Sequence, residues 1–449
     1  MNARDDSYRQ AGCLLIAGSL AFSAPVLGQS ASDAIDSISG SASVFGGVVH
    51  TRLDTGTGEE SNTKPSAGVS GDIGGSMSSG ANNLDLRYGG RLTTRRSLPN
   101  GDQTDDSSIT GASRYQYADP SSIMDFNLGH SVQSVRNDTG FVLNAGDYDT
   151  RHTVRGGAGL TFQPGEVTSL RLSGQAGKSF GSGDLEDEKS WTTGADLRRR
   201  LSARSTGLLT TRRSWSESQG VDTTIDNAEL GYERQLETGW FSIAAGGSWS
   251  ETEFPGDRVT NESEAVTGHV SRIWSTTDSS TTVRYERRLS DSATDLSLDL
   301  PEELSFLPDT IQLQDLVTTD SVLVAHNTSR LCRICRFSML AEASMLESEL
   351  SDAKTHEYRT SLNLSVDITR VHEFLASYSW QAEAGEDSGD IQVQIHRLSL
   401  GVTRRLAEDV RLGLELNQAW LRDDQEGSDR DEYGLRVFLT RNFSLMERR

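Results

Sequence analysis

Residues 84–95, Leu-Asp-Leu-Arg-Tyr-Gly-Gly-Arg-Leu-Thr-Thr-Arg, decide the fold class, because apolar and polar side chains alternate along them. In an extended strand, successive side chains point to opposite faces. Leu84, Leu86 and Leu92 would therefore share one face, together with Tyr88. Charged residues would lie on the other face. This period of two predicts a β-strand with one apolar and one polar side.

The same alternation recurs from residue 41 to the C-terminal region. Clear further cases lie at residues 154–162, 358–368, 410–416 and 433–443. Short connections are expected near 79–82, 118–122, 163–166, 202–205, 237–239, 275–278, 331–336, 369–371 and 407–409. Longer ones fall between them, including 54–64, 97–107, 136–151, 252–263 and 290–314. Alternating short turns and long loops are typical of an outer-membrane barrel. A propeller with blades of similar length is the competing architecture.

Composition favours the barrel over a soluble core. Only 35% of the 449 residues are hydrophobic, and the chain has 43 glycines and 8 prolines. No stretch after the N-terminal region approaches the ~20 apolar residues of a membrane helix. A barrel with polar inward and apolar outward side chains explains this low hydrophobicity. We therefore predict an all-β, transmembrane, antiparallel up-and-down barrel of about 20 strands (18–20), with short periplasmic turns and longer extracellular loops.

The chain divides into four predicted segments. Residues 1–28 resemble an export signal, with Arg4 and Arg9 before an apolar stretch and small residues up to Gly28. A poorly buried N-terminal helix is the alternative. Residues 29–40 would be a short periplasmic segment, 41–443 the barrel and 444–449 a periplasmic tail. This organisation places the protein in the outer membrane of a Gram-negative cell after export to the periplasm.

Charge and aromatic residues agree with that location. The formal charge of −22 argues against binding to nucleic acid, which needs an excess of Lys and Arg. Acidic residues concentrate in expected outer loops, at 54–60, 102–106, 184–188, 386–390 and 423–432. The seven tryptophans lie near predicted strand ends, as in the two aromatic girdles of membrane barrels.

Arginines on the inward face are the candidate functional residues. The strand parity places these side chains toward the lumen: Arg87, Arg91, Arg95, Arg198, Arg200, Arg284, Arg288, Arg411 and Arg436. Arginine stays charged and binds carboxylate or sulfate groups with its planar fork, so such a lining favours anions. The alternative is that these arginines pair with inward acids such as Asp196, Glu286 and Glu415 and only stiffen the wall.

Other candidate sites are weaker. Cys332 and Cys335 lie in a predicted tight turn, where a local disulfide is plausible in the periplasm. The apolar residues of the 290–314 loop indicate a lid or constriction, or else packing on the outer rim. The histidines, including His130, His269 and His396, form no recognisable catalytic set. We expect no catalytic residues, no cofactor and no metal site.

Two features resemble a known family. The strand Tyr433–Phe443 resembles the terminal strand that the outer-membrane assembly machinery recognises, although six residues follow its aromatic end. The segments 196–209 and 402–414, each an arginine-rich strand end, a tight turn and an alternating strand, resemble hairpins of outer-membrane β-barrel porins encoded beside exopolysaccharide and exosortase systems. The resemblance covers residues 41–443 and implies a role in exopolysaccharide export or envelope biogenesis.

The expected function is thus a porin-like channel for an anionic polysaccharide or other anionic solutes. A plugged structural or adhesin-like barrel is the alternative, and a barrel-embedded hydrolase is a third. Expected partners are outer-membrane lipids, lipopolysaccharide, the barrel assembly machinery and components of polysaccharide export. The sequence leaves the oligomeric state open.

Overall fold

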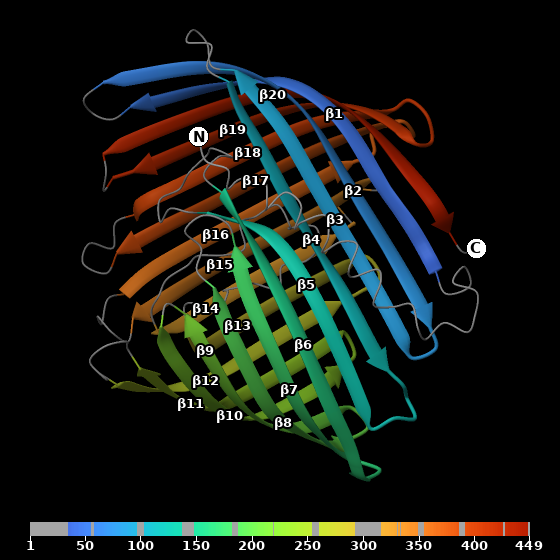
Figure 1. Ribbon diagram of the computed structural model, residues 1–449, viewed down its shortest axis with the longest axis vertical. Helices are drawn as coiled ribbons and strands as arrows, with labels where there is room; N and C mark the ends of the chain where they lie inside the picture. Colours follow the sequence, from blue (N-terminus) through green and yellow to red (C-terminus); the bar gives the residue numbers. More distant parts are fainter. Residues whose placement is uncertain are drawn as a thin grey trace, which may run out of the picture.

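In the computed structural model, twenty antiparallel strands form one sheet that closes on itself (Figure 1). The structure describes residues 35–54, 58–96, 103–136, 148–181, 187–218, 220–253, 260–291, 316–329, 331–332, 334–348, 354–385, 391–424 and 427–447. The strands are β1 (Ile35–Asp54), β2 (Glu59–Ser79), β3 (Asn82–Arg96), β4 (Gln103–Ala118), β5 (Met124–Arg136), β6 (Tyr148–Gly165), β7 (Thr168–Gly181), β8 (Glu188–Ser202), β9 (Ser205–Ser218), β10 (Val221–Leu236), β11 (Gly239–Glu253), β12 (Thr260–Ser275), β13 (Ser279–Asp291), β14 (Leu316–Thr328), β15 (Cys335–Ser348), β16 (Lys354–Val366), β17 (His372–Gly385), β18 (Ile391–Arg405), β19 (Val410–Asp423) and β20 (Ser428–Glu447).

The first and last strands close the barrel. Strand β1 pairs antiparallel with β2 on one side and with β20 on the other, from Ser37 opposite Glu447 to Asp54 opposite Asp429. Every other strand pairs with its sequence neighbours, which is the up-and-down order. The prediction of a closed antiparallel barrel with about 20 strands is therefore confirmed.

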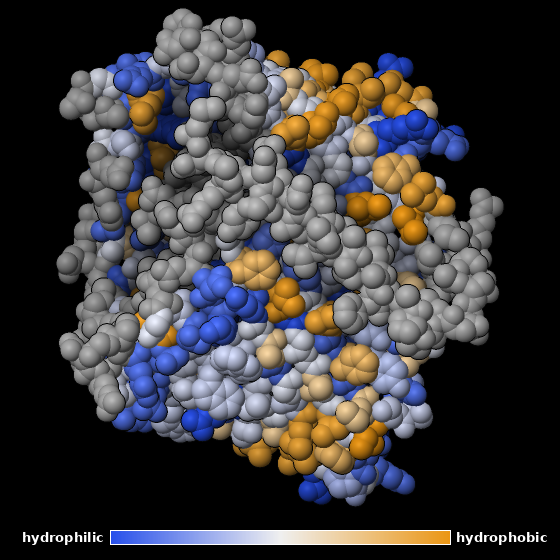
Figure 2. Space-filling model, viewed as in Figure 1, coloured by the Kyte–Doolittle hydropathy of each residue, from blue (hydrophilic) through white to orange (hydrophobic). Residues whose placement is uncertain are grey.

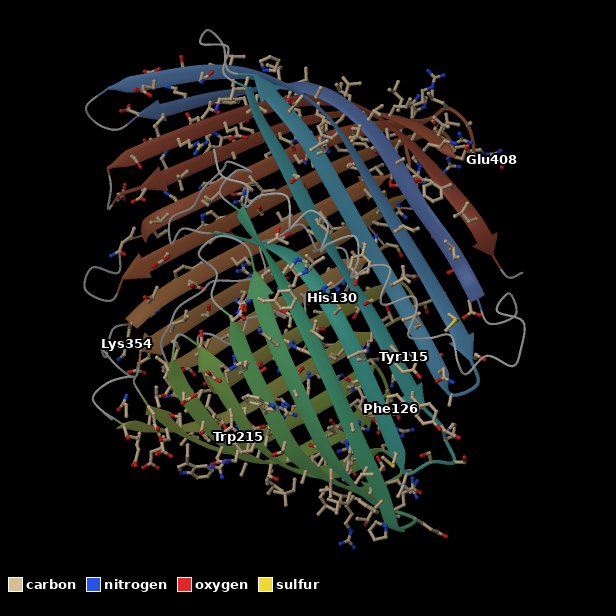
Figure 3. The ribbon with its side chains drawn as sticks, in the orientation of Figure 1. Tyr115, Phe126, His130, Trp215, Lys354 and Glu408 are labelled. Atoms are coloured by element: carbon tan, nitrogen blue, oxygen red, sulfur yellow. A yellow bond between two sulfur atoms is a disulfide. The ribbon has the colours of Figure 1, made fainter. Side chains whose placement is uncertain are left out.

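The longest connections lie at one end of the barrel, between β5 and β6 and between β13 and β14. The same end also has short ones: β2 begins at Glu59, inside the long loop predicted for 54–64, and β10 begins at Val221, soon after β9 ends at Ser218. Short turns join β2 to β3, β4 to β5 and so on, and Gly80 allows the first of these by adopting a φ of 60°. Figure 3 shows Glu408 in one short turn on the right, and Lys354 at the opposite, long-loop end on the left. The predicted lid lies mostly between Asp291 and Leu316, outside the described residues.

The strands extend beyond the predicted barrel limits. Strand β1 begins at Ile35 rather than at residue 41, and β20 continues to Glu447 rather than ending at Phe443. These ends pair with each other across the seam, so backbone hydrogen bonding and not apolar alternation sets their length. The predicted export signal, residues 1–28, lies outside the described part of the chain.

Exposed apolar side chains lie side by side on the outer face of the barrel. The cross-strand row Leu92, Val69, Val44 and Leu439 is 54%, 50%, 55% and 41% exposed. In Figure 2 hydrophobic residues gather at the upper right of the visible face and near its lower edge, and hydrophilic ones gather at the lower left. Large exposed apolar patches of this kind are unusual on a soluble monomer. Among the described residues, no helix is long and apolar enough to cross a membrane.

Tryptophans lie almost entirely on this outer face. The register places Trp191 beside Trp215 near the long-loop end, and Trp274 on the outer face near the short-turn end. Trp240 does not belong to the expected outer girdle. Gly239 lies opposite Trp274 on the outer face, so the next residue, Trp240, points to the inner face. A one-residue offset moves a side chain to the other side of a sheet.

Two inner-face phenylalanines lie across glycines of neighbouring strands. A Cβ atom on Gly68 would collide with the ring of Phe45, and one on Gly413 would collide with the ring of Phe438. Both glycines thus leave space for an aromatic ring, a known way to cover glycine in a strand. This packing fixes the phenylalanines flat against the inner wall.

Candidate functional site

The strand register places the predicted arginines on the inner face. This is the face that carries Phe45 and Thr93, which the pairing of β1, β2 and β3 places on the same side of the sheet. These arginines are Arg87 and Arg91 on β3, Arg198 and Arg200 on β8, Arg284 and Arg288 on β13, Arg411 on β19 and Arg436 on β20. The side chain of Arg95 lies outside the described part of the structure, although its backbone pairs with Ser66. The arginines are distributed around the barrel rather than gathered in one cluster.

Several of these arginines have acidic partners. Arg436 forms an ion pair with Glu415, and Arg284 Nη2 lies 2.7 Å from Glu286 Oε2. Arg198 and Glu233 are separated by 4.0 Å. The arginine side chains are 32%, 46% and 58% exposed, so solvent screens these pairs and each contributes little to stability. Pairing reduces the net positive charge of the lining but orients the guanidinium groups.

The structure adds inner-face arginines that the sequence analysis did not single out. One of them, Arg171, reaches across β6 to Asp125, with Nη2 2.7 Å from Oδ1, over the space left by Gly159. Together with four predicted residues, these form an arginine wall on β3–β9: Arg87, Arg91, Arg114, Arg155, Arg171, Arg198, Arg200 and Arg212. The acids described on the inner face of the same strands are fewer: Asp85, Asp125, Glu188 and Asp196. Extending the strand parity to β4, β6, β7 and β9 would have identified the added arginines.

An aromatic ring links this wall to the seam of the barrel. The Arg91 guanidinium lies 4.6 Å from the ring centre of Phe45, and that of Arg436 lies 5.7 Å from it. Arg436 also lies 5.4 Å from the ring centre of Phe438. Cation–π contacts hold arginines over ring faces while leaving their hydrogen-bond donors available. The seam therefore carries positive charge in a defined orientation.

A polar cavity occupies the inner face near the short-turn end of β13–β20. Its volume is about 1000 Å³. Serine, threonine and asparagine side chains supply most of its lining, with Arg336, Glu373, Glu415 and Arg436 among the charged members. Arg336 Nη2 lies 3.0 Å from Glu373 Oε1, so both arginines at the cavity have an acid beside them. Most of the lining residues are thus polar, and Asp278 is a third acid among them.

Two histidines, His130 and His152, meet on the outer face, whereas His269 and His396 lie on other strands. His130 Nε2 lies 3.3 Å from His152 Nδ1, and Tyr88 Oη lies 2.8 Å from His130 Nδ1 (His130 is labelled in Figure 3). Tyr88 reaches His130 across Gly111 of β4, which has no side chain to block it. These residues come together only because β3, β4, β5 and β6 pair in that order. Within the described residues, no group of three or more His, Cys, Asp or Glu side chains could hold a metal ion.

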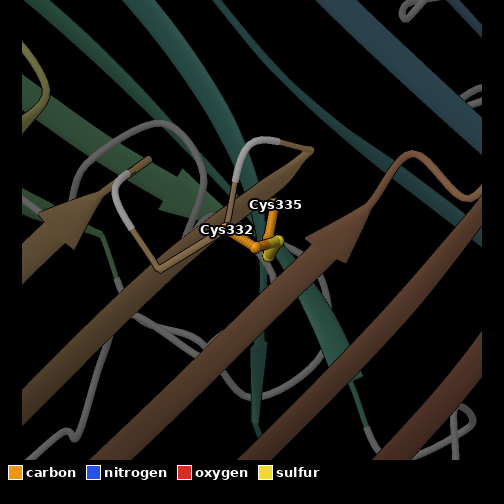
Figure 4. Close-up of a disulfide and its surroundings, with 2 residues drawn as sticks. All are labelled: Cys332 and Cys335. Atoms are coloured by element: carbon orange, nitrogen blue, oxygen red, sulfur yellow. A yellow bond between two sulfur atoms is a disulfide. The ribbon is translucent and has the colours of Figure 1, made fainter.

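The two cysteines form a disulfide in the β14–β15 turn (Figure 4). Their Cα atoms are 5.2 Å apart, within the usual range for such a bond. The backbone N–H of Cys335 also donates to the carbonyl oxygen of Cys332 at 3.3 Å. The bond lies at the short-turn end and closes a three-residue separation in sequence.

Several solved structures are similar to this chain, each at low sequence identity. No protein-family model matches the chain, and neither does any curated protein. It is similar to the crystal structure of OccAB1 of Acinetobacter baumannii, at 12% identity over 92% of this chain and 99% of that one, with a TM-score of 0.38. A mutant of the ferric enterobactin receptor PfeA of Pseudomonas aeruginosa is 10% identical over 91% and 81%, with a TM-score of 0.48. OpdK of the same organism, solved with vanillate, is 9% identical over 91% and 98%, with a TM-score of 0.37. The fold of this chain accordingly rests on its own strand pairing, described above.

Proposed function

We propose that this barrel lies in the outer membrane of a Gram-negative cell and acts as a passive, porin-like conduit for anionic solutes, above all an anionic polysaccharide or its fragments. The arginine wall is the observation that supports this proposal. Its guanidinium groups line one side of the lumen and outnumber the acids described on the same strands. Positive charge along a pore lowers the electrostatic barrier for anions.

The apolar outer face supports the membrane location. Leu414, Leu416, Leu435 and Val437 are 48%, 47%, 43% and 47% exposed, and they lie side by side on β19 and β20. Burying such a side chain contributes roughly 1.5–3 kcal/mol, which a bilayer would supply. In this proposal the protein transports and does not catalyse.

Single-channel conductance in a planar bilayer tests the conduit. A salt gradient across the bilayer reports the ion selectivity of the open channel. We expect anion-selective steps from the unchanged protein. Arg87→Glu with Arg91→Glu should shift the reversal potential toward cation selectivity, because both side chains are on the inner face.

A matched control reverses two charges on the outside of the barrel. Arg199 and Arg234 lie on the outer face near the short-turn end, so Arg199→Glu with Arg234→Glu makes the same change in net charge. The control should leave selectivity close to that of the unchanged protein. If the inner and outer pairs behave alike, the arginine wall does not set selectivity.

One observation favours the alternative of a plugged structural barrel. On the inner face, Ser248, Thr267 and Ser361 are only 1%, 3% and 1% exposed. Solvent access to these side chains of the lumenal wall is therefore restricted. A barrel that inserts stably but shows no conductance would support this alternative.

A further inference from the structure

The polar cavity contains a regular row of uncharged hydrogen-bonding side chains. On six successive strands, β13–β18, directly paired residues on the inner face are Ser280, Asn327, Ser338, Asn363, Ser377 and Ser399. All six line the cavity. We call them the Ser/Asn row. Its regularity follows from the strand pairing and is invisible in the linear sequence.

From this row we infer a binding path for hydroxyl-rich, uncharged stretches of a glycan chain. The inference rests on the proposed function and deepens it, because it assigns a second lumenal wall to the sugar hydroxyls. Serine hydroxyls and asparagine amides each donate and accept hydrogen bonds. Sugar hydroxyls do the same, whereas a purely anionic ligand needs only donors.

The side chains of the row are available for a ligand. Asn327, Ser338 and Ser377 form no side-chain hydrogen bond within the described part of the structure, and all three are at least partly exposed. Asn363 donates to Ser361 at 3.3 Å through Nδ2, which leaves its amide oxygen free to accept. A polar cavity with convergent, unused donors and acceptors is the usual form of a site for a polar ligand.

The dimensions fit a chain rather than a single small molecule. Paired strands lie ~4.8 Å apart, so the row extends over roughly 24 Å. Strands in such barrels are tilted by roughly 35–45°, and a row across them therefore rises obliquely along the wall. A ligand bound along the row would be guided lengthwise through the lumen.

Two ion pairs lie beside the row, and Asp278 is a further acidic residue of the cavity lining. Arg336 and Glu373 lie beside one part of the row, with Ser365 Oγ donating to the same carboxylate at 2.8 Å. Arg436 and Glu415 lie beside another part, where Ser399 Oγ donates to Glu415 Oε1 at 3.3 Å. Arg436 Nε is a buried nitrogen without a hydrogen-bond partner at the edge of the cavity. Beside these two pairs the wall offers hydrogen bonds while the paired charges largely offset each other.

Apolar surface at the cavity completes the match to a sugar. Leu375 lines the cavity and is 40% exposed, and Phe438 presents its ring there. Pockets for polar organic ligands combine such apolar contacts with a few placed hydrogen bonds. The opposite, arginine-rich wall would take the acidic groups of a mixed polymer.

Binding of maltohexaose to the full-length barrel in detergent tests the inference by calorimetry, which does not require conduction. Polyethylene glycol of matched mass is the control ligand, because it accepts hydrogen bonds but has almost no donors. We expect maltohexaose to bind and the glycol not to bind. Equal binding of both, or of neither, would overturn the Ser/Asn row as a glycan site.

Variants locate the binding. Ser338→Ala, Asn363→Leu and Ser377→Ala together should weaken maltohexaose binding roughly ten- to a hundredfold, because three hydrogen-bonding groups are lost. The matched control on the opposite wall is Asn127→Leu with Ser169→Ala and Ser173→Ala, on inner-face positions of β5 and β7. The control should bind as the unchanged protein does, and equal weakening by both sets would place the site elsewhere. If the triple row variant does not fold, Ser377→Ala alone replaces it.

The outcomes separate this inference from the proposed conduit. Conductance without sugar binding would overturn the Ser/Asn row and leave the conduit standing. Sugar binding that the row variants weaken, in a barrel that never conducts, would support the row and overturn the conduit. Block of single-channel current by maltohexaose, lost in the row variants, supports both.

Discussion

At the residue scale, glycines shape the inner wall because they have no side chain and leave room for neighbouring rings. The ring of Phe45 lies over Gly68, and the Arg91 guanidinium lies 4.6 Å from the centre of that ring. Because Gly68 has no side chain, the Phe45 ring can lie flat on the wall. The ring in turn supports the Arg91 guanidinium. A charged lumenal group is easier to orient when a rigid ring supports it.

Gly68→Ala should destabilise the barrel by about 1–3 kcal/mol, because an added methyl overpacks the site. Its Cβ would collide with the carbonyl oxygen of Leu92 and with the Phe45 ring. Gly46→Ala is the control, since its Cβ would meet nothing closer than 4.0 Å. Titrations with guanidinium chloride compare the unfolding midpoints of the two variants. The folded fraction is read from the mobility of unboiled samples on a denaturing gel. Equal midpoints would show that Phe45 does not depend on Gly68.

At the element scale, alternation predicted the strands well and their ends poorly. The pattern of Leu84, Leu86 and Leu92 is enough to identify β3 and its inner arginines, because a period of two fixes both faces. In contrast, 423–432 was expected to be an outer loop, yet β20 already begins at Ser428. Charged residues are stable on either face where a strand rises into water, so alternation disappears there while pairing continues.

Contacts between strands were the part of the candidate site that the sequence could not show. The Tyr88 and His130 contact requires Gly111 to lie between them, and the Ser/Asn row requires the register of six strands. Neither register nor neighbour contact is encoded in the local period of one strand. The arginines were predictable because only their parity mattered.

The turn between β14 and β15 yields a prediction of its own. With Cys13→Ser to remove the third cysteine, the folded protein should contain no reactive thiol until a reductant is added, because Cys332 and Cys335 are bonded. Quantitative alkylation followed by mass spectrometry measures this. Cys332→Ser with Cys335→Ser should lower stability by no more than about 2 kcal/mol, as expected for so small a covalent loop. Two thiols alkylated without reductant would contradict the bonded turn.

At the scale of the whole molecule, the barrel reverses the usual distribution of polarity. Its outer face is apolar around Leu92, Val69 and Val44, and its inner face carries arginine, serine and asparagine. The low overall hydrophobicity follows from this arrangement, because half of every strand faces a polar lumen. The same arrangement separates two lumenal walls, one rich in arginine and one rich in uncharged hydrogen-bonding groups.

Adjacent residues of β19 provide the sharpest test of the membrane assignment. Leu416 faces outward and is 47% exposed, whereas Asn417 faces inward. Leu416→Arg should lower the stability of the barrel in lipid vesicles by about 2–4 kcal/mol if it lies near the bilayer midplane, because the charge must enter hydrocarbon. Asn417→Arg should change stability little, because a lumenal arginine remains hydrated. Guanidinium titrations of vesicle-folded protein measure both variants. A soluble barrel would tolerate the exposed Leu416→Arg as readily as its neighbour, so equal stabilities would remove the physical basis for placing this chain in a membrane.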